Sequence, residues 1–167
     1  MGLDTRISVT LRAALNSVLD LGTSKSELGY LKDITLLSGT GTNQADRIFH
    51  DNRTINASAT DSLDLAGGGL VDPFNAALTI VKLKLVYVYA DPANTNNVVV
   101  TRPASNGVPL FAAAGDALPV LPGGEFLWVA PGAGITVTPT TADLLDLVNS
   151  AGGSQVKCDV VLIGTSA

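Results

Sequence analysis

The residues most able to carry out acid–base chemistry lie around His50, the only histidine of this 167-residue chain. Asp46, Asp51 and Arg53 are close to it in sequence, and an imidazole beside carboxylates can act as a general base or as a pH switch. No serine, cysteine or second histidine stands where it would complete a catalytic set with these groups. The pattern therefore favours a hydrogen-bonded structural histidine over a catalytic one.

Acidic residues offer a second kind of site, for calcium. Asp61, Asp64 and Asp72, with Asn75 nearby, carry the oxygen ligands that calcium prefers. Their spacing does not match the Asp-x-Asp-x-Asn-Gly pattern of a calcium-binding loop. We therefore expect solvated aspartates in turns, and no metal site.

Two glycine-rich segments and a single cysteine are the remaining residues that could bind a ligand or react. Gly39-Thr40-Gly41 and Gly67-Gly68-Gly69 superficially resemble phosphate loops, but they lack the Gly-x-x-x-x-Gly-Lys-Ser/Thr spacing and open no predicted helix. Cys158 lies in an apolar run, where a buried core residue is expected rather than a nucleophile or half of an internal disulfide. The sequence therefore predicts no enzyme activity and no cofactor.

Aromatic residues point to a contact surface rather than to a reaction. Phe126 and Trp128 share one face of a predicted strand, and Tyr87 and Tyr89 share one face of another. Core packing or a subunit contact explains the Phe126 and Trp128 pair more simply than sugar stacking does. We predict that these four residues contribute to an interface. The alternative is a stacking surface of Trp128, Tyr87 and Tyr89 that binds a glycan.

The composition favours burial against other protein surfaces. Hydrophobic residues make up 46% of the chain, whereas charged residues make up only 15%, against about 25% in an average domain. A monomer with so few charges would expose neutral patches of the kind that mark protein–protein contacts. The net charge is −5 and the ten Lys and Arg residues are scattered, so nucleic acid is not an expected partner.

The sequence also gives expectations about location. No window approaches the 18–20 apolar residues of a membrane span, and the first residues lack the basic start and apolar middle of a signal peptide. We therefore expect no membrane partner and a product that is made and kept in a cytosol, or that leaves by lysis.

The strand on which the rest is organised is predicted over residues 78–90, a segment rich in β-branched and aromatic residues and free of Gly and Pro. Period-2 alternation predicts that each face collects every second side chain. One face is expected to carry Val81, Leu83, Leu85, Tyr87 and Tyr89, and the other Ile80, Lys82, Lys84, Val86 and Val88. The second face turns from polar to apolar along the strand.

From Ala45 onward, short β-prone runs recur every 8 to 15 residues or so and are separated by Gly and Pro turns, which is typical of a β-sandwich or jelly roll. The predicted strands are 46–50, 53–57, 61–65, 78–90, 97–102, 108–111, 125–130, 134–138, 144–149 and 155–163. We predict an all-β, jelly-roll-like β-sandwich over residues 46–167.

The first 45 residues are predicted to form an N-terminal arm or peripheral strands. Residues 6–21 alternate like a strand but also fit a helical stripe, and we favour a strand that a turn at Gly22-Thr23-Ser24 closes. Residues 30–38 form a second predicted strand, which the polar, glycine-rich segment after it would end.

Several blocks of the sequence resemble small structural proteins encoded in the virion modules of tailed bacteriophages. The likeness covers about residues 35–165, in the same order along the chain. The blocks are 39–49, 53–55, 62–67, 82–90, 94–100, 122–126, 141–145 and 159–164. Such proteins often carry Arg before the Pro-Gly-Gly turn, where this chain has Leu121, which removes one possible salt bridge.

This resemblance implies a place on a virus particle. We expect a capsid decoration or cement protein on the exterior of the capsid, with the major capsid protein and further copies of itself, as a homotrimer, for partners. The alternatives are a tail or fibre component or a host- or glycan-binding module. A cell-wall hydrolase ranks last, because nothing in the sequence positions its acidic residues as a pair.

Overall fold

The computed structural model describes residues 2–167, and this part of the chain is all-β, with several antiparallel sheets and no helix. It therefore contains no helix that could span a membrane. The strands are β1 (Thr5–Leu19), β2 (Gly22–Ser38), β3 (Gln44–Ala45), β4 (Arg47–Ile55), β5 (Thr60–Asp64), β6 (Leu70–Val71), β7 (Ala77–Leu78), β8 (Lys82–Ala90), β9 (Val98–Thr101), β10 (Ala117–Val120), β11 (Glu125–Val129), β12 (Ile135–Thr136), β13 (Leu144–Asn149) and β14 (Val156–Thr165).

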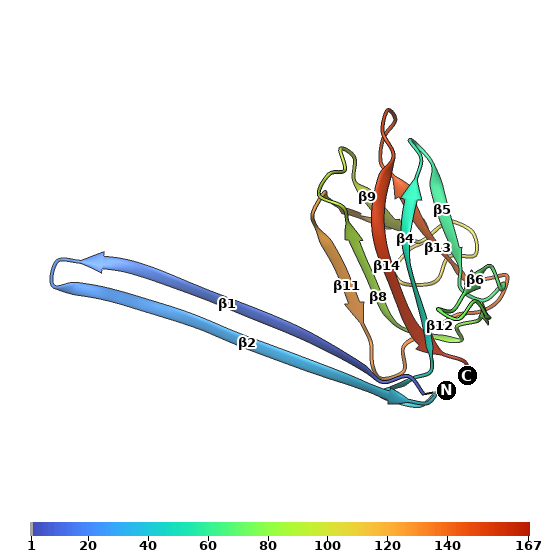
Figure 1. Cartoon of the computed structure of the whole chain (residues 1–167), viewed down its shortest axis with the longest axis horizontal. Coiled ribbons are helices and arrows are strands. Elements are labelled where there is room, and N and C mark those ends of the chain that lie inside the picture. The colour runs from blue at the N-terminus through green and yellow to red at the C-terminus, as the bar shows by residue number, and fades with distance from the viewer. Residues whose placement is uncertain (1) are drawn as a thin grey trace.

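Two sheets face each other and form a sandwich-like body (Figure 1). One has the strand order β11-β8-β14-β4, with the short β12 paired to β8, and the other has the order β10-β9-β13-β5. All pairings within these two sheets are antiparallel. The long strands β8 and β14 pair with each other in the middle of the first sheet.

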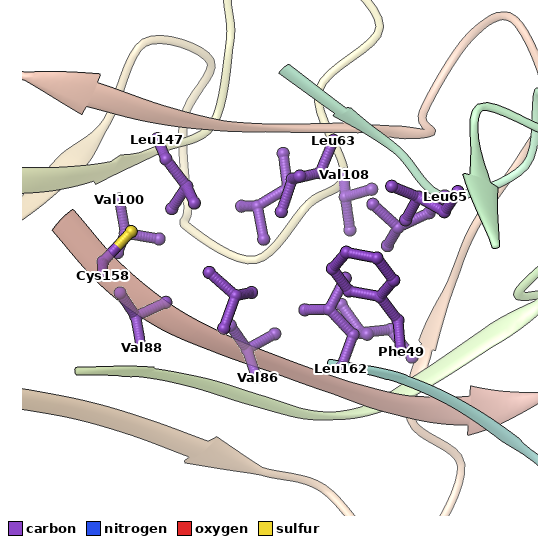
Figure 2. Packing of buried hydrophobic residues seen from close by; sticks show 14 of the residues in the cluster. Phe49, Leu63, Leu65, Val86, Val88, Val100, Val108, Leu147, Cys158 and Leu162 are labelled. Atoms are coloured by element: carbon purple, nitrogen blue, oxygen red, sulfur yellow. The ribbon is translucent and has the colours of Figure 1, made fainter. Parts of the chain in front are cut away.

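The main core lies between these two sheets, where apolar side chains from both inner faces interdigitate. Every second residue of β13 and β9 points inward, which is why these strands alternate between buried and half-buried residues. Figure 2 shows Leu63, Val100 and Leu147 from one sheet meeting Val86, Val88 and Leu162 from the other.

A β-bulge in β8 changes the predicted faces of the central strand. Ile163 pairs with Leu85, but the next residue, Gly164, pairs with Leu83, so Lys84 is an extra residue. Leu83 consequently packs in the main core while Leu85 packs on the outside of the sheet. The prediction that these two leucines share a face was therefore wrong. A Cβ at position 164 would collide with the backbone of Lys82, so the bulge needs glycine there.

Three other predicted strands differ from the structure. Residues 46–50 and 53–57 were predicted as two strands, but β4 runs through both because it pairs with β14 along its whole length. Residues 108–111 form no strand, only an isolated bridge at Gly107. The strand β10 was not predicted because it contains Pro119, which an edge strand such as β10 tolerates.

The N-terminal segment is a long antiparallel hairpin of β1 and β2 that projects away from the body (Figure 1). Strand was the correct choice for residues 6–21, but the turn lies at Asp20 and Leu21, and Gly22 already belongs to β2. The 15 residues of β1 span about 50 Å at ~3.3 Å per residue. That residues 46–167 fold independently of this hairpin stays a prediction.

Candidate interaction surface

The hairpin, called the arm from here on, has one apolar and one polar face. Two residues that pair across β1 and β2 point to the same face, as Leu11 and Tyr30 do. In every pair the two residue numbers add to 41, so an odd-numbered residue of β1 always pairs with an even-numbered residue of β2. Odd residues of β1 and even residues of β2 therefore make one face, called the apolar face. It consists mainly of Ile7, Val9, Leu11, Ala13, Leu15, Leu19, Leu28, Tyr30, Ile34 and Leu36, with Lys32 as its only charged residue.

The opposite face of the arm is mostly polar. It carries Arg6, Ser8, Thr10, Arg12, Asn16, Thr23, Lys25, Glu27, Asp33 and Thr35, with Ala14, Val18, Leu31 and Leu37 as separate apolar residues. The Asp33 carboxylate accepts hydrogen bonds from the Ser8 hydroxyl (2.6 Å) and the Arg6 guanidinium (2.5 Å). These two contacts, in that order, lower the pKa of Asp33. They cross-link the strands of the arm close to its root.

The root of the apolar face is buried against the body in a second apolar cluster. Leu36 is fully buried, and Ile7 and Ile34 pack beside it. They contact the outer face of the β11-β8-β14-β4 sheet, where Leu85 and Ile163 belong to the same cluster. Leu85 faces outward in regular alternation with Val86 and Tyr87, so the cluster follows from the pleat of β8, and the bulge changes only the direction of Leu83.

Hydrogen bonds fix the chain that leads from the arm into the body. The Asn43 amide donates to the carbonyl of Pro131 (2.8 Å), and the Leu37 amide donates to that of Asn43 (2.9 Å). The Lys84 ammonium, on a side chain that is only 2% exposed, donates to the carbonyls of Pro131 and Gly132. Burial lowers the pKa of Lys84. The buried Lys84 side chain thus holds the loop at Pro131 and Gly132, and this loop in turn binds Asn43 at the end of the arm.

Beyond the root, the apolar face of the arm has no cover within residues 2–167. Leu11, Leu28 and Tyr30 are about half exposed, and Leu15 is 76% exposed. Side chains of this kind are normally buried, and an isolated two-stranded hairpin is marginally stable in water. The arm is therefore the part of the molecule that most needs a partner.

The outer face of the β11-β8-β14-β4 sheet continues the apolar surface of the arm. Tyr87 and Val161 pair across β8 and β14 and lie at the border of the second cluster, and Leu127 pairs with Tyr87 on the other side. Glu125 and Asp159 flank Tyr89 on the neighbouring strands. Burial and the nearby Glu125 carboxylate raise the pKa of Tyr87. This region, called the outer patch, is apolar with an acidic border.

The four aromatic residues predicted as an interface do not lie on one surface. Tyr87 and Tyr89 are on the outer patch, half-buried. Phe126 and Trp128 pair with Val88 and Val86 and point inward, where both pack against the main core. Only the two tyrosines could meet a partner directly on the outer face, and the interface role of all four stays a prediction.

The structure separates the groups that surround His50 in sequence. The imidazole is exposed on the outer face of β4, and it has no hydrogen-bond partner in residues 2–167, contrary to the prediction of a hydrogen-bonded histidine. Asp46 instead accepts hydrogen bonds from Ser166 near the C-terminus. Asp51 binds Arg53 (2.9 Å). These residues do not converge on a reaction centre.

The three aspartates considered for calcium each have a separate structural role. Asp61 accepts two hydrogen bonds from the Arg53 guanidinium (2.6 and 2.8 Å), which raise the pKa of Arg53. Asp64 accepts from the amides of the turn that follows it, and Asp72 caps the next turn in the same way. Residues 2–167 contain no cluster of His, Cys, Asp or Glu suited to a metal ion. The glycine-rich segments considered for phosphate form turns that precede no helix.

Cys158 is buried in the main core, as predicted. Burial, followed by the Asp61 carboxylate, raises its pKa to about 12 from an ordinary value of 9.0. Because the unfolded thiol ionises first, the free energy of unfolding should fall as the pH rises from about 9 towards 12.

We therefore expect Cys158 to be inert to iodoacetamide at pH 8 in the folded protein and fully reactive in guanidinium chloride. Cys158→Ala should have a flatter dependence of unfolding free energy on pH between 9 and 12, measured by chemical denaturation. Rapid alkylation of the native protein would contradict this burial.

Sequence reasoning missed the apolar face of the arm and the bulged Lys84. The alternation of Ile7, Val9 and Leu11 was visible, but the partner face on β2 follows only when the turn is placed at Asp20 and Leu21. Comparisons of the chain with protein-family models, with curated proteins and with solved structures found no match.

Proposed function

We propose that this protein is a structural component of a phage particle, a capsid decoration or cement protein that binds the lattice of the major capsid protein. The observation that carries the proposal is the arm, which extends about 33 Å beyond its buried root, at ~3.3 Å per residue, and presents an uncovered apolar face. An element of this kind gains its stability from what it binds. Repeated binding at many sites of a shell would add to that gain through multivalency.

The connections between strands support a jelly-roll arrangement of the body, which is part of this proposal. Going along the chain, β4 and β5 lie in opposite sheets, as do β8 and β9, β10 and β11, and β13 and β14. Such repeated crossing between two facing sheets is the pattern expected of jelly rolls, which occur in viral capsid proteins and in lectins. Fold alone does not choose between these roles.

The resemblance to virion proteins of tailed phages favours the particle over a free lectin. Under this proposal the protein is made in the host cytoplasm and lies on the capsid exterior, and it acts without enzyme activity or cofactor. A tail or fibre position is the second candidate, because an amphipathic arm could also bind a neighbouring subunit within a tail.

The deciding experiment is electron microscopy of purified particles that carry a gold-labelled tag at the C-terminus of this protein. Label distributed over the whole shell supports the decoration role. Label at a single vertex or along the tail would replace it with the tail role, and the absence of label from intact particles would contradict both.

A further inference from the structure

We infer that the exposed apolar face of the arm is covered by a second copy of this chain, with the arm of one subunit lying on the outer patch of its neighbour. The arm and the outer patch belong to one continuous apolar surface. Ile7 and Ile34 of the arm pack over Leu85 and Ile163 in the second cluster, and Tyr87 is at the edge of that cluster. A neighbour's arm laid beside the root would extend this cluster without a break.

The free part of the outer face is shorter than the exposed part of the arm. The arm beyond Val9 is about 33 Å long, whereas residues 157–161 of β14, which the subunit's own root does not cover, span about 17 Å at ~3.3 Å per residue, so part of a neighbour's arm can lie on this face. The exposed part of the arm cannot reach this patch on its own subunit, because beyond the root it points away from the body (Figure 1). A neighbouring subunit can offer the same surface at the required distance.

Charge favours the outer patch over a bundle of arms. Lys32 is the only charged residue on the apolar face, and that face has no carboxylate. Arms packed in parallel around a symmetry axis would bring equivalent Lys32 side chains together. The outer patch instead offers the Glu125 carboxylate, with which an arm docked there can pair its lysine. The Asp159 carboxylate beside it already accepts a hydrogen bond from Asn52 (2.6 Å).

The arrangement is heterologous, since each subunit donates an arm and receives one through different surfaces. Such contacts close into a ring when the rotation between subunits permits it, and we expect three subunits. Each subunit then contributes twice to the buried area, once through its arm and once through its outer patch. This inference deepens the proposed function, on which it rests, by naming what covers the arm.

The test uses two full-length variants, Leu28→Cys on the arm and Leu127→Cys on the outer patch, of which one carries a mass tag. The native Cys158 is buried and does not interfere. After the two variants are mixed at micromolar concentration, a bis-maleimide linker should join them, because its length tolerates small differences in register. The control pair is Leu31→Cys with Leu127→Cys, since Leu31 lies on the polar face.

We expect at least ten times more cross-linked heterodimer from the Leu28→Cys pair than from the control pair, and a trimer by light scattering of the unmodified protein. Efficient cross-linking of Leu28→Cys to itself would overturn the inference, because it would show that arms pack on arms. A monomeric protein without cross-links would overturn it as well. In that case, electron microscopy of gold-labelled particles would still show whether the protein lies on the capsid, independently of this inference.

Discussion

A chain in which residues 10–31 are replaced by Asn-Gly is expected to keep a folded body but to lose its place on particles. Val9 and Lys32 are directly opposite in the hairpin and form the same kind of pair as the native closing pair, Leu19 and Gly22, so a two-residue turn can close the shortened arm in the native register. None of the deleted residues belongs to either apolar cluster. The free energy of unfolding should therefore change little, while the contact between subunits through the apolar face is lost, and with it the multivalent binding to the shell.

Binding of the shortened chain to particles, measured by sedimentation with purified shells, should fall below detection. Circular dichroism and guanidinium denaturation of the same chain test the body. If the shortened chain is unfolded, the arm supplies part of the core, and the division at residue 45 is wrong. If it is folded and still occupies particles fully, the arm has no anchoring role.

Point substitutions separate the two faces of the arm. Leu15 and Val18 are both strongly exposed near the tip, at 76% and 87%, but they lie on opposite faces. Burial of a leucine is worth about 1.5–3 kcal/mol, so Leu15→Asn with Leu28→Asn should weaken the association between subunits by at least about 100-fold. Val18→Asn with Leu31→Asn is the matched control and should have a much smaller effect.

Asn149→Asp is expected to cause the largest loss of stability among single substitutions that preserve side-chain size. Asn149 is 2% exposed, and its amide nitrogen donates to the carbonyls of Ile55, Asn56 and Ser154 (3.3, 3.1 and 2.8 Å). Its amide oxygen accepts from the Asn96 side chain (3.0 Å). One side chain therefore ties three loops together at the end of the body.

A carboxylate at position 149 would face three carbonyl oxygens without a proton to donate. We expect a loss of about 3 kcal/mol or more in the free energy of unfolding, because buried acceptors would lose their donor. Lowering the pH should restore part of this loss, since a protonated Asp can donate one hydrogen bond. Asn56→Asp, at an exposed site on a neighbouring loop, is the control. Equal effects at the two positions would contradict this role of Asn149.

The amino-acid sequence by itself determined the all-β class, most of the strands after residue 45 and the turn roles of Asp64 and Asp72. The prediction of a solvated turn aspartate was wrong for Asp61, which lies in β5 and pairs with Arg53. The features that were predicted correctly depend on neighbours in the chain. Alternation over four to eight residues reports a strand, and Gly, Pro and Asp report turns through their own backbone preferences. The burial of Cys158 followed in the same way, from the apolar run around it.

Only the tertiary structure decided which faces are buried and what they meet. Side chains alternate with period 2, so the single extra residue Lys84 turns Leu83 and Leu85 to opposite sides of the sheet. Whether such a residue is extra depends on the register with β14, which lies more than 70 residues away along the chain. The apolar face of the arm could not be predicted from the sequence for the same reason. Its two halves come from different strands, and they meet only in the register that the turn at Asp20 and Leu21 sets.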